Sequence, residues 1–213
     1  VRRMLYPGGH YTVATIPNEP RWHPRLPVID RAGHVVRENL YSVEDPALDI
    51  TLLATRKGEL LMVWETAIRS GLGISLMNPA DLLDPAYAGA RRTAHLEKMG
   101  FDPITVAEGD DGFLVASMNP ALRYQGLTLA VLGPDGALRK REDVRDAGES
   151  YVRKLTAVRE RDGYVLFADV ILGYGEPIAA GTMRITAAGE RPFGGFHRFG
   201  DLRFPEVLVA NGS

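Results

Sequence analysis

Short apolar runs separated by glycine-containing turns recur along the whole chain. The stretch DGYVLFADVILGYGEPIAAGTMRITAAGE, residues 162–190, opens with a turn and is apolar through Tyr164–Ala168. It breaks at Gly173–Pro177, then alternates apolar and polar positions before Gly189. This pattern predicts two β-strands joined by a glycine-rich loop and ended by a tight turn.

The same turn followed by an apolar strand occurs four times, marked by Gly9, Gly58, Gly112 and Gly163. The markers are spaced at intervals of roughly fifty residues, and a period of that length is typical of repeat architectures. Each of the last three markers is preceded by a short apolar strand, and every marker is followed by a loop and another strand. This repeated pattern therefore predicts four units, each of three or four antiparallel strands.

The first unit has no strand before its marker, whereas FPEVLVANGS (Phe204–Ser213) follows the last unit without a partner. A C-terminal strand that completes the N-terminal unit closes the units into a ring, and closure removes free sheet edges. We therefore expect an all-β fold, a four-bladed β-propeller forming a single domain over residues 1–213. The expected blades are residues 204–213 plus 1–44, 45–100, 101–150 and 151–203.

Three sets of motifs carry a resemblance to known proteins: KGELLMVW, DDGFLVAS with GPDGAL, and RDGYVLFA with TAAGE. They resemble the degenerate blades of bacterial β-propeller repeat proteins, and the resemblance covers nearly the whole chain. It implies a fold far more than an activity, since propellers host many functions. Two alternatives remain: a mixed α+β domain, because Ala86–Phe101 has a helix-like composition, and a partial array of a larger ring.

Composition narrows the classes of partner. The formal net charge is −2 and no basic cluster stands out, so neither nucleic acid nor an anionic membrane is expected as a partner. No apolar run is long enough to span a membrane, and the N-terminal residues lack the apolar segment of a signal peptide. We expect a soluble chain. The absence of cysteine excludes disulfides and thiolate metal sites but does not indicate a compartment.

The propeller resemblance implies that the innermost strands begin at the face where the loops after the second strands also open. Alignment of the inner strands places Asp49, Asp102, Arg153 and Glu206 at comparable positions. Carboxylates held close together need a cation, a proton or an arginine partner. We expect the three carboxylates to bind a divalent metal in the central channel or the hydroxyls of a polar ligand, and Arg153 to pair a ligand anion. In the alternative interpretation these carboxylates only form turns.

The loops on that face carry the expected ligand-binding side chains, which combine aromatic rings with arginine and histidine. These are Trp22, His23, Arg123, Tyr124 and Tyr174, together with Arg153 from the inner strand. Alternatively, Trp22 is a packing residue over the first blade and His23 is a solvated surface histidine.

Two functions are compatible with these residues. The first is a binding module that holds a small polar ligand, a glycan or a protein segment. The second is an enzyme acting on a carbohydrate or small polar substrate, as a hydrolase, lyase or isomerase. In the enzyme, Asp49, Asp102 or Glu206 supplies acid and base, Arg153 stabilises negative charge and His23 transfers protons.

Overall fold

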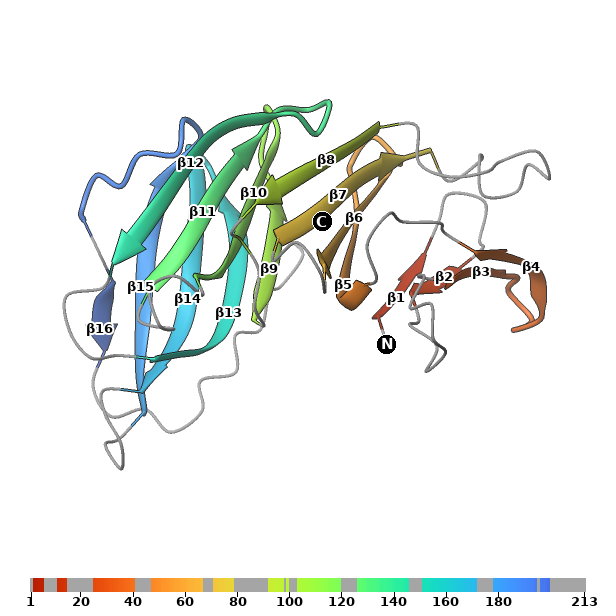
Figure 1. The fold of residues 1–213 in the computed structure, drawn as a ribbon, viewed down its shortest axis with the longest axis horizontal. Coiled ribbons are helices and arrows are strands. Elements are labelled where there is room, and N and C mark those ends of the chain that lie inside the picture. The colour runs from red at the N-terminus through yellow and green to blue at the C-terminus, as the bar shows by residue number, and fades with distance from the viewer. Residues whose placement is uncertain are drawn as a thin grey trace. The chain divides into compact units, whose positions relative to one another are not determined.

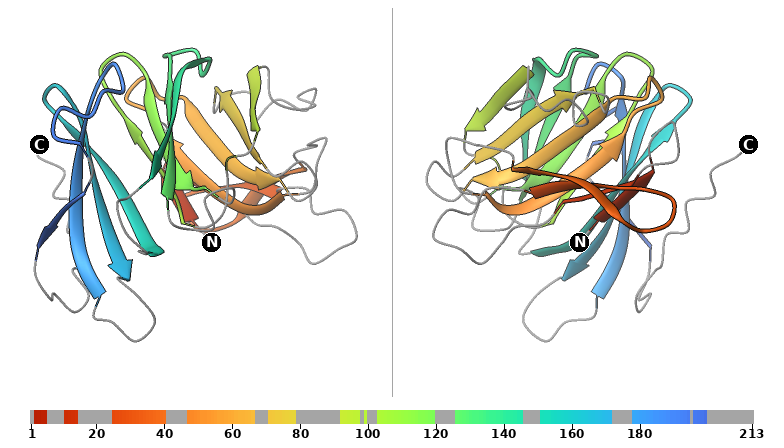
Figure 2. Two further views of the ribbon diagram at one scale, coloured as in Figure 1. Left: turned by 60° about the vertical axis from the view of Figure 1, so that its left-hand side comes forward. Right: turned by 90° about the vertical axis from the view of Figure 1, so that its right-hand side faces the viewer.

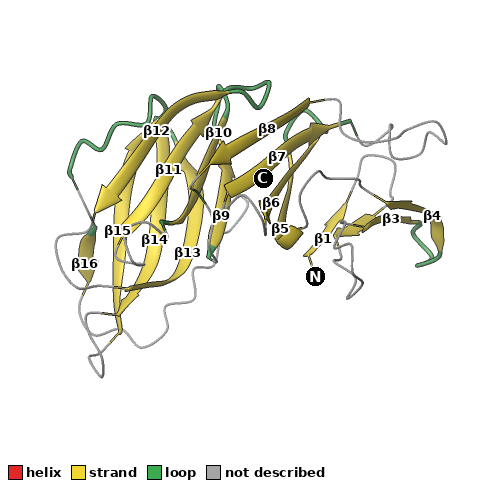
Figure 3. Ribbon diagram, viewed as in Figure 1, coloured by secondary structure: helices red, strands yellow, loops and turns green. Residues whose placement is uncertain are grey.

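A computed structural model gives the fold of the chain (Figure 1). It describes residues 2–5, 11–14, 25–40, 47–66, 71–78, 92–97, 99, 103–119, 126–145, 151–171, 178–194 and 196–199. Every regular element in these ranges is a β-strand (Figure 3), so they include no helix able to cross a membrane. The all-β class expected from the sequence is confirmed.

The strands form four sheets of four antiparallel strands, and in each sheet the strands lie side by side in chain order. The first sheet contains β1 (Arg2–Leu5), β2 (Tyr11–Ala14), β3 (Arg25–Ile29) and β4 (Val35–Leu40). The second contains β5 (Ala47–Ala54), β6 (Leu60–Thr66), β7 (Gly71–Met77) and β8 (Arg92–Glu97). The third contains β9 (Ile104–Glu108), β10 (Phe113–Met118), β11 (Gly126–Leu132) and β12 (Leu138–Arg145). The fourth contains β13 (Tyr151–Glu160), β14 (Gly163–Ile171), β15 (Ile178–Thr186) and β16 (His197–Phe199).

The sheets belong to two compact units, Val1–Lys98 and Met99–Ser213. In the first unit β1 and β2 lie beside β5, and in the second β9 and β10 lie beside β13 (Figure 2). The part of the chain that the structure describes contains no closed sheet. Phe204–Ser213, expected to close the ring, lies outside the described residues. The expectation that no strand precedes Gly9 is wrong, because Arg2–Leu5 form β1 and pair with β2, so the first sheet has four strands without the C-terminal segment. Ring closure and the single-domain boundaries stay predictions.

Four hairpins share one five-residue turn. In each, the first residue's N–H donates to the fifth residue's carbonyl, and a glycine at the fourth position donates back to the first residue's carbonyl. That glycine has φ between 78° and 92°, in the left-handed region that glycine enters most readily. The turns span residues 30–34, 55–59, 133–137 and 186–190. The expected glycine turns at Gly33, Gly136 and Gly189 are confirmed, and Gly58 belongs with them.

The markers Gly112 and Gly163 have a steric reason as well. A Cβ on Gly112 would lie 1.9 Å from the Leu132 carbonyl oxygen, and one on Gly163 would lie 2.1 Å from the Ile185 carbonyl oxygen. In both sheets the third strand therefore passes too close to the start of the second strand for any side chain. Gly9 lies outside the described residues.

The helix considered for Ala86–Phe101 is wrong for residues 92–97, which form β8. The strand pairs with β7 in continuous antiparallel register, from Arg92 opposite Leu76 to Glu97 opposite Gly71. Helix propensity is a weak preference that an available strand edge overrides.

The first unit is densely packed around β6 and β7, whose residues are all buried. Two glycines on β7 make room for neighbouring rings. A Cβ on Gly73 would lie 2.0 Å from Cε2 of Trp64, and one on Gly71 would lie 2.7 Å from Nε2 of His95. Gly71 and Gly73 therefore leave the space that the ring of His95 on β8 and the ring of Trp64 on β6 occupy.

The core of the second unit lies between the two sheets β9–β12 and β13–β16. Each sheet contributes alternate residues to it, among them Leu114 and Leu129 from one sheet and Leu166 and Met183 from the other. Alternate residues of a strand share one face of the sheet, so these positions define the facing sides. A hydrogen bond also joins the two sheets: the backbone N–H of Ala157 on β13 donates to Thr105 Oγ1 on β9 at 2.9 Å.

Candidate functional site

Each sheet has two different ends. In an antiparallel meander, the connection between the first and second strands and that between the third and fourth strands leave from the same end. This turn end carries the tight glycine turns. The connection between the second and third strands, such as 67–70 or 120–125, joins strands at the opposite end, which we call the loop end.

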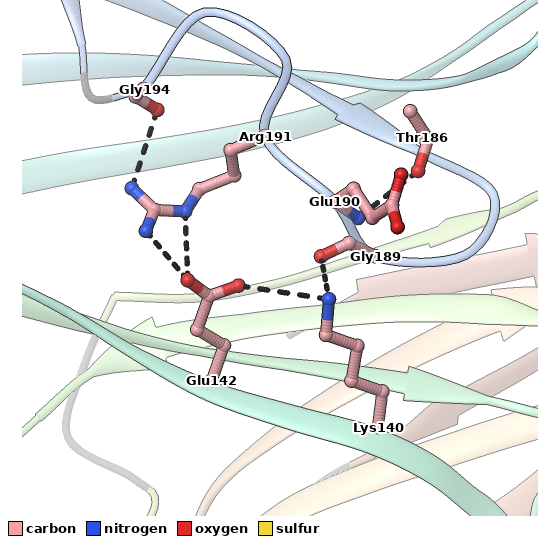
Figure 4. Close-up of polar contacts among 7 residues, drawn as sticks. All are labelled: Lys140, Glu142, Thr186, Gly189, Glu190, Arg191 and Gly194. Carbon is pink, nitrogen blue, oxygen red and sulfur yellow. Dashed lines mark hydrogen bonds and ion pairs between the residues drawn. The ribbon is translucent and has the colours of Figure 1, made fainter.

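The turn ends of the second unit are fastened together by polar contacts (Figure 4). Lys140 Nζ on β12 donates to the Gly189 carbonyl at 2.9 Å. Arg191, between β15 and β16, donates from Nε and Nη2 to Glu142 Oε1 at 3.1 and 2.5 Å. Arg159 also pairs with Asp110 across the two sheets. These contacts join the two facing sheets at their turn ends.

Other charges at the turn ends are likewise paired within the unit. Arg139 Nη1 lies 2.7 Å from Asp111 Oδ2, and this hydrogen bond raises the pKa of Arg139. Arg184 Nη2 lies 2.7 Å from Glu160 Oε1. Both pairs are solvent-exposed, so each contributes little to stability. Because these groups are engaged with one another, they are poor candidates for binding a charged ligand.

The loop end of the second sheet has a fixed base. The Thr66 hydroxyl donates to the Gly71 carbonyl at 3.0 Å and accepts from the Gly71 amide at 3.1 Å. Both residues are buried. The two bonds close the ends of segment 67–70, which contains Arg69, without using any residue of that segment.

The loop end of the third sheet is fixed by a chain of three side chains. The backbone N–H of Asn119 donates to the Gly126 carbonyl at 3.0 Å and joins the two ends of segment 120–125. Asn119 Nδ2 donates to Thr128 Oγ1 at 2.9 Å, and Thr128 Oγ1 donates to Asp143 Oδ1 at 2.8 Å. Asn119 and Thr128 are almost wholly buried, whereas the Asp143 side chain is 49% exposed. This Asn–Thr–Asp chain runs from the interior to the surface.

Sequence reasoning missed these anchors. Asn119 is the first residue of the expected binding loop NPALRYQG, and Thr128, two residues after that loop, is a polar residue within the apolar strand GLTLAVL. That single hydroxyl was the available signal. Asp143 carried none, because it is one of six charged residues in the strand LRKREDVR.

Two of the inner-strand candidates fall on described strands. Asp49 belongs to β5 and Arg153 to β13, and the pairing register shifts between Ala47 and Ile50 and between Val152 and Lys154. Such β-bulges re-aim side chains and are frequent beside active sites. The side chains of Asp49 and Arg153 lie outside what the structure describes.

The remaining predicted site residues also lie outside the described residues, so their convergence on one face stays a prediction. They are Asp102, Glu206, Trp22, His23, Arg123, Tyr124 and Tyr174. Within the described ranges, no group of three or more His, Asp or Glu side chains is arranged to hold a metal ion. The expected channel metal therefore also stays a prediction.

The described residues supply a rigid base for loops rather than a reacting pair of groups. Loops held on a rigid scaffold are where proteins most often place binding residues. Comparison with protein-family models finds no matching family, and comparison with curated proteins finds no match.

Proposed function

We propose that this chain is a binding module that holds a small polar ligand, a glycan or a protein segment at the loop ends of its sheets. One observation carries the proposal. The loops at these ends are closed at the base by buried polar anchors, Thr66 with Gly71 and Asn119 with Gly126. Loops whose ends are fixed on a rigid sheet are where proteins most often place binding residues.

The residues of these loops suit polar ligands. Segment 120–125 contains Arg123 and Tyr124, and segment 172–177 contains Tyr174. A guanidinium binds carboxylate or phosphate through two parallel hydrogen bonds, and a tyrosine offers both a ring face and a hydroxyl.

A ligand-binding experiment tests this function. We expect a panel of neutral and acidic oligosaccharides, small carboxylates and short peptides to contain a ligand whose binding is measurable by calorimetry. Changing Arg123 and Tyr124 together to alanine should weaken that binding about tenfold or more. The matched control is Arg161→Ala, which removes an exposed arginine from the β13–β14 turn at the opposite end. Equal binding by the wild type and the loop variant would contradict the proposal.

We also propose that the four sheets are the blades of a four-bladed β-propeller closed by Phe204–Ser213. The support is the succession of four antiparallel four-stranded sheets along the chain. Removal of residues 204–213 should then expose an edge of the first sheet. Hydrogen exchange should accelerate in residues 2–40 and stay unchanged in 103–145. Unchanged exchange in both ranges would rule out closure by this segment.

The second candidate function is acid/base chemistry by Asp49, Asp102 and Glu206. It is favoured by the register shift in β5 where Asp49 lies, since bulges are frequent beside active sites. The double change Asp49→Asn with Asp102→Asn should abolish any turnover of a carbohydrate substrate while the melting temperature is kept. Turnover that survives this change would exclude the two aspartates as the acid and base.

A further inference from the structure

The Asn–Thr–Asp chain connects the surface of the outer strand β12 with the base of segment 120–125. Its residues come from the end of β10, from β11 and from β12, which lie side by side in the sheet (Figure 1). Thr128 and Asp143 are directly opposite each other in the register. The half-exposed carboxylate of Asp143 is therefore linked, through a single hydroxyl, to the residue that precedes the segment.

Asp143 sets the direction of the hydrogen bonds in this chain. An ionised carboxylate only accepts hydrogen bonds, and a threonine hydroxyl has one proton to donate. Thr128 donates that proton to Asp143 Oδ1 at 2.8 Å, so the Thr128 oxygen is left as an acceptor. It accepts from Asn119 Nδ2 at 2.9 Å. The charge at one end thus decides which atom of Asn119 is bonded at the other.

The same reasoning selects one orientation of the Asn119 side chain. An asparagine amide has a donor nitrogen on one side and an acceptor oxygen on the other, and a half-turn exchanges them. With the amide turned round, Asn119 Oδ1 and Thr128 Oγ1 would face each other with no proton between them, because the Thr128 proton is donated to Asp143. Without the carboxylate, the Thr128 hydroxyl is able to donate to Asn119 Oδ1, and both orientations are allowed.

Burial makes the choice between these orientations significant. Asn119 is 1% exposed and Thr128 is wholly buried, so bulk water does not offer alternative partners. Ser117 lies directly opposite Thr128, and its buried hydroxyl has no hydrogen-bond partner among the described residues. Thr128 thus donates to Asp143 although another hydroxyl is its cross-strand neighbour. The reason is that hydrogen bonds to a charged acceptor are stronger than those between neutral groups.

The ion pair of Asp143 does not explain this arrangement. Arg141 Nη2 lies 3.5 Å from Asp143 Oδ1, on the same strand, and the Asp143 side chain is 49% exposed. A partly exposed pair of this kind contributes little to stability. The hydrogen bond from Thr128 is therefore the contact through which Asp143 acts on the interior.

We propose that Asp143 is a positioning residue for segment 120–125. By accepting the Thr128 proton it holds the Asn119 side chain in one of two orientations, and so fixes the start of the segment from two strands away. The inference rests on the proposed function, in taking this segment as a binding loop, and adds the group that regulates it.

NMR of the full chain tests the inference in the absence of any ligand. In Asp143→Ala, hydrogen exchange of the Asn119 Nδ2 protons and of the Asn119 backbone N–H should become about tenfold faster or more. The Gly71 N–H, which donates to Thr66 at the base of segment 67–70, is the internal reference and should not change. Asp111→Ala is the matched control. It removes another exposed carboxylate paired with an arginine, at the turn end, and should leave exchange at Asn119 unchanged.

Two variants of Thr128 show whether Asp143 acts through this hydroxyl. Thr128→Ser keeps the hydroxyl and should retain wild-type exchange at Asn119, whereas Thr128→Val should reproduce the effect of Asp143→Ala. Within Thr128→Val, adding Asp143→Ala should have no further effect on Asn119, since the connection is already broken. Melting temperatures check that each variant is folded, and Asp143→Ala alters only a half-exposed side chain.

The inference and the proposed function fail in different ways. Unchanged exchange at Asn119 in Asp143→Ala overturns the inference, and so does a further effect of Asp143→Ala within Thr128→Val. If exchange responds as expected but no oligosaccharide, carboxylate or peptide of the panel binds the wild type, the inference stands and the proposed function is wrong. A panel member that binds should lose about tenfold or more in affinity in Asp143→Ala. Equal affinity would show that Asp143 does not regulate binding and would overturn the inference.

Discussion

The packing of Trp64 on Gly73 allows a stability change to be worked out from the structure. A methyl group at position 73 would lie 2.0 Å from Cε2, 2.1 Å from Cζ2 and 2.5 Å from Nε1 of Trp64. Carbon atoms in contact prefer separations of about 3.5–4.0 Å, so the indole would have to shift by more than about 1 Å. Trp64 is only 5% exposed and is surrounded by buried strands, so no open space receives it.

We therefore expect Gly73→Ala to destabilise the chain. Overpacking of a close-packed interior costs about 1–3 kcal/mol, and the large overlap here places the change toward the upper part of that range. Removing a glycine from a strand offsets about 0.5–1 kcal/mol of this through the unfolded chain. A net loss of about 2 kcal/mol in the free energy of unfolding should be seen in urea denaturation followed by tryptophan fluorescence and circular dichroism.

A double-mutant cycle isolates the cause. Trp64→Leu removes the ring that the methyl group would overlap, so adding Gly73→Ala to it should cost at least about 1 kcal/mol less than in the wild type. Circular dichroism reports the unfolding of the variants that lack this tryptophan. If the two changes are additive, or if Gly73→Ala alone is neutral, the steric explanation for this glycine is wrong.

Three further outcomes are expected. Ser117→Ala should leave stability unchanged or raise it by up to about 1 kcal/mol in urea denaturation, because the buried Ser117 hydroxyl has no hydrogen-bond partner; a loss above that amount would show a hidden partner. Thr128→Val should lower stability by about 2 kcal/mol, since it leaves the hydrogen-bonding groups of Asn119 and Asp143 without the shared hydroxyl; a neutral result would mean that the chain of bonds does not form. The His34 amide, which donates to Asp30, lowers the pKa of Asp30. The ionised form therefore favours the folded hairpin above the unfolded pKa of about 3.9, and this contribution disappears as the pH falls through the lower folded value; an NMR titration midpoint at or above 3.9 would contradict this.

Local features were predictable from the sequence because their causes are local. The turn at Gly136 needs a left-handed residue four positions into a hairpin, and GPDGAL shows it directly. The strand β14 was predicted from RDGYVLFA, in which a turn is followed directly by an apolar run. Residues 92–97 were predicted as part of a helix from their composition, but composition does not reveal that the edge of β7 is free to pair with them.

The candidate site was harder to predict because it depends on pairing between distant strands. The alignment of inner strands placed Asp49 and Arg153 at equivalent sequence positions, but the register shifts beside them are set by the partner strands. A shift of one residue reverses the face to which a side chain points. The chain from Asn119 through Thr128 to Asp143 crosses three strands, so no short motif contains it.

The anchor at Asn119 and Gly126 fixes the separation of the two chain ends that segment 120–125 has to bridge. Thr66 and Gly71 do the same for segment 67–70. A randomised library in either interval therefore starts from two fixed ends when the flanking residues stay constant.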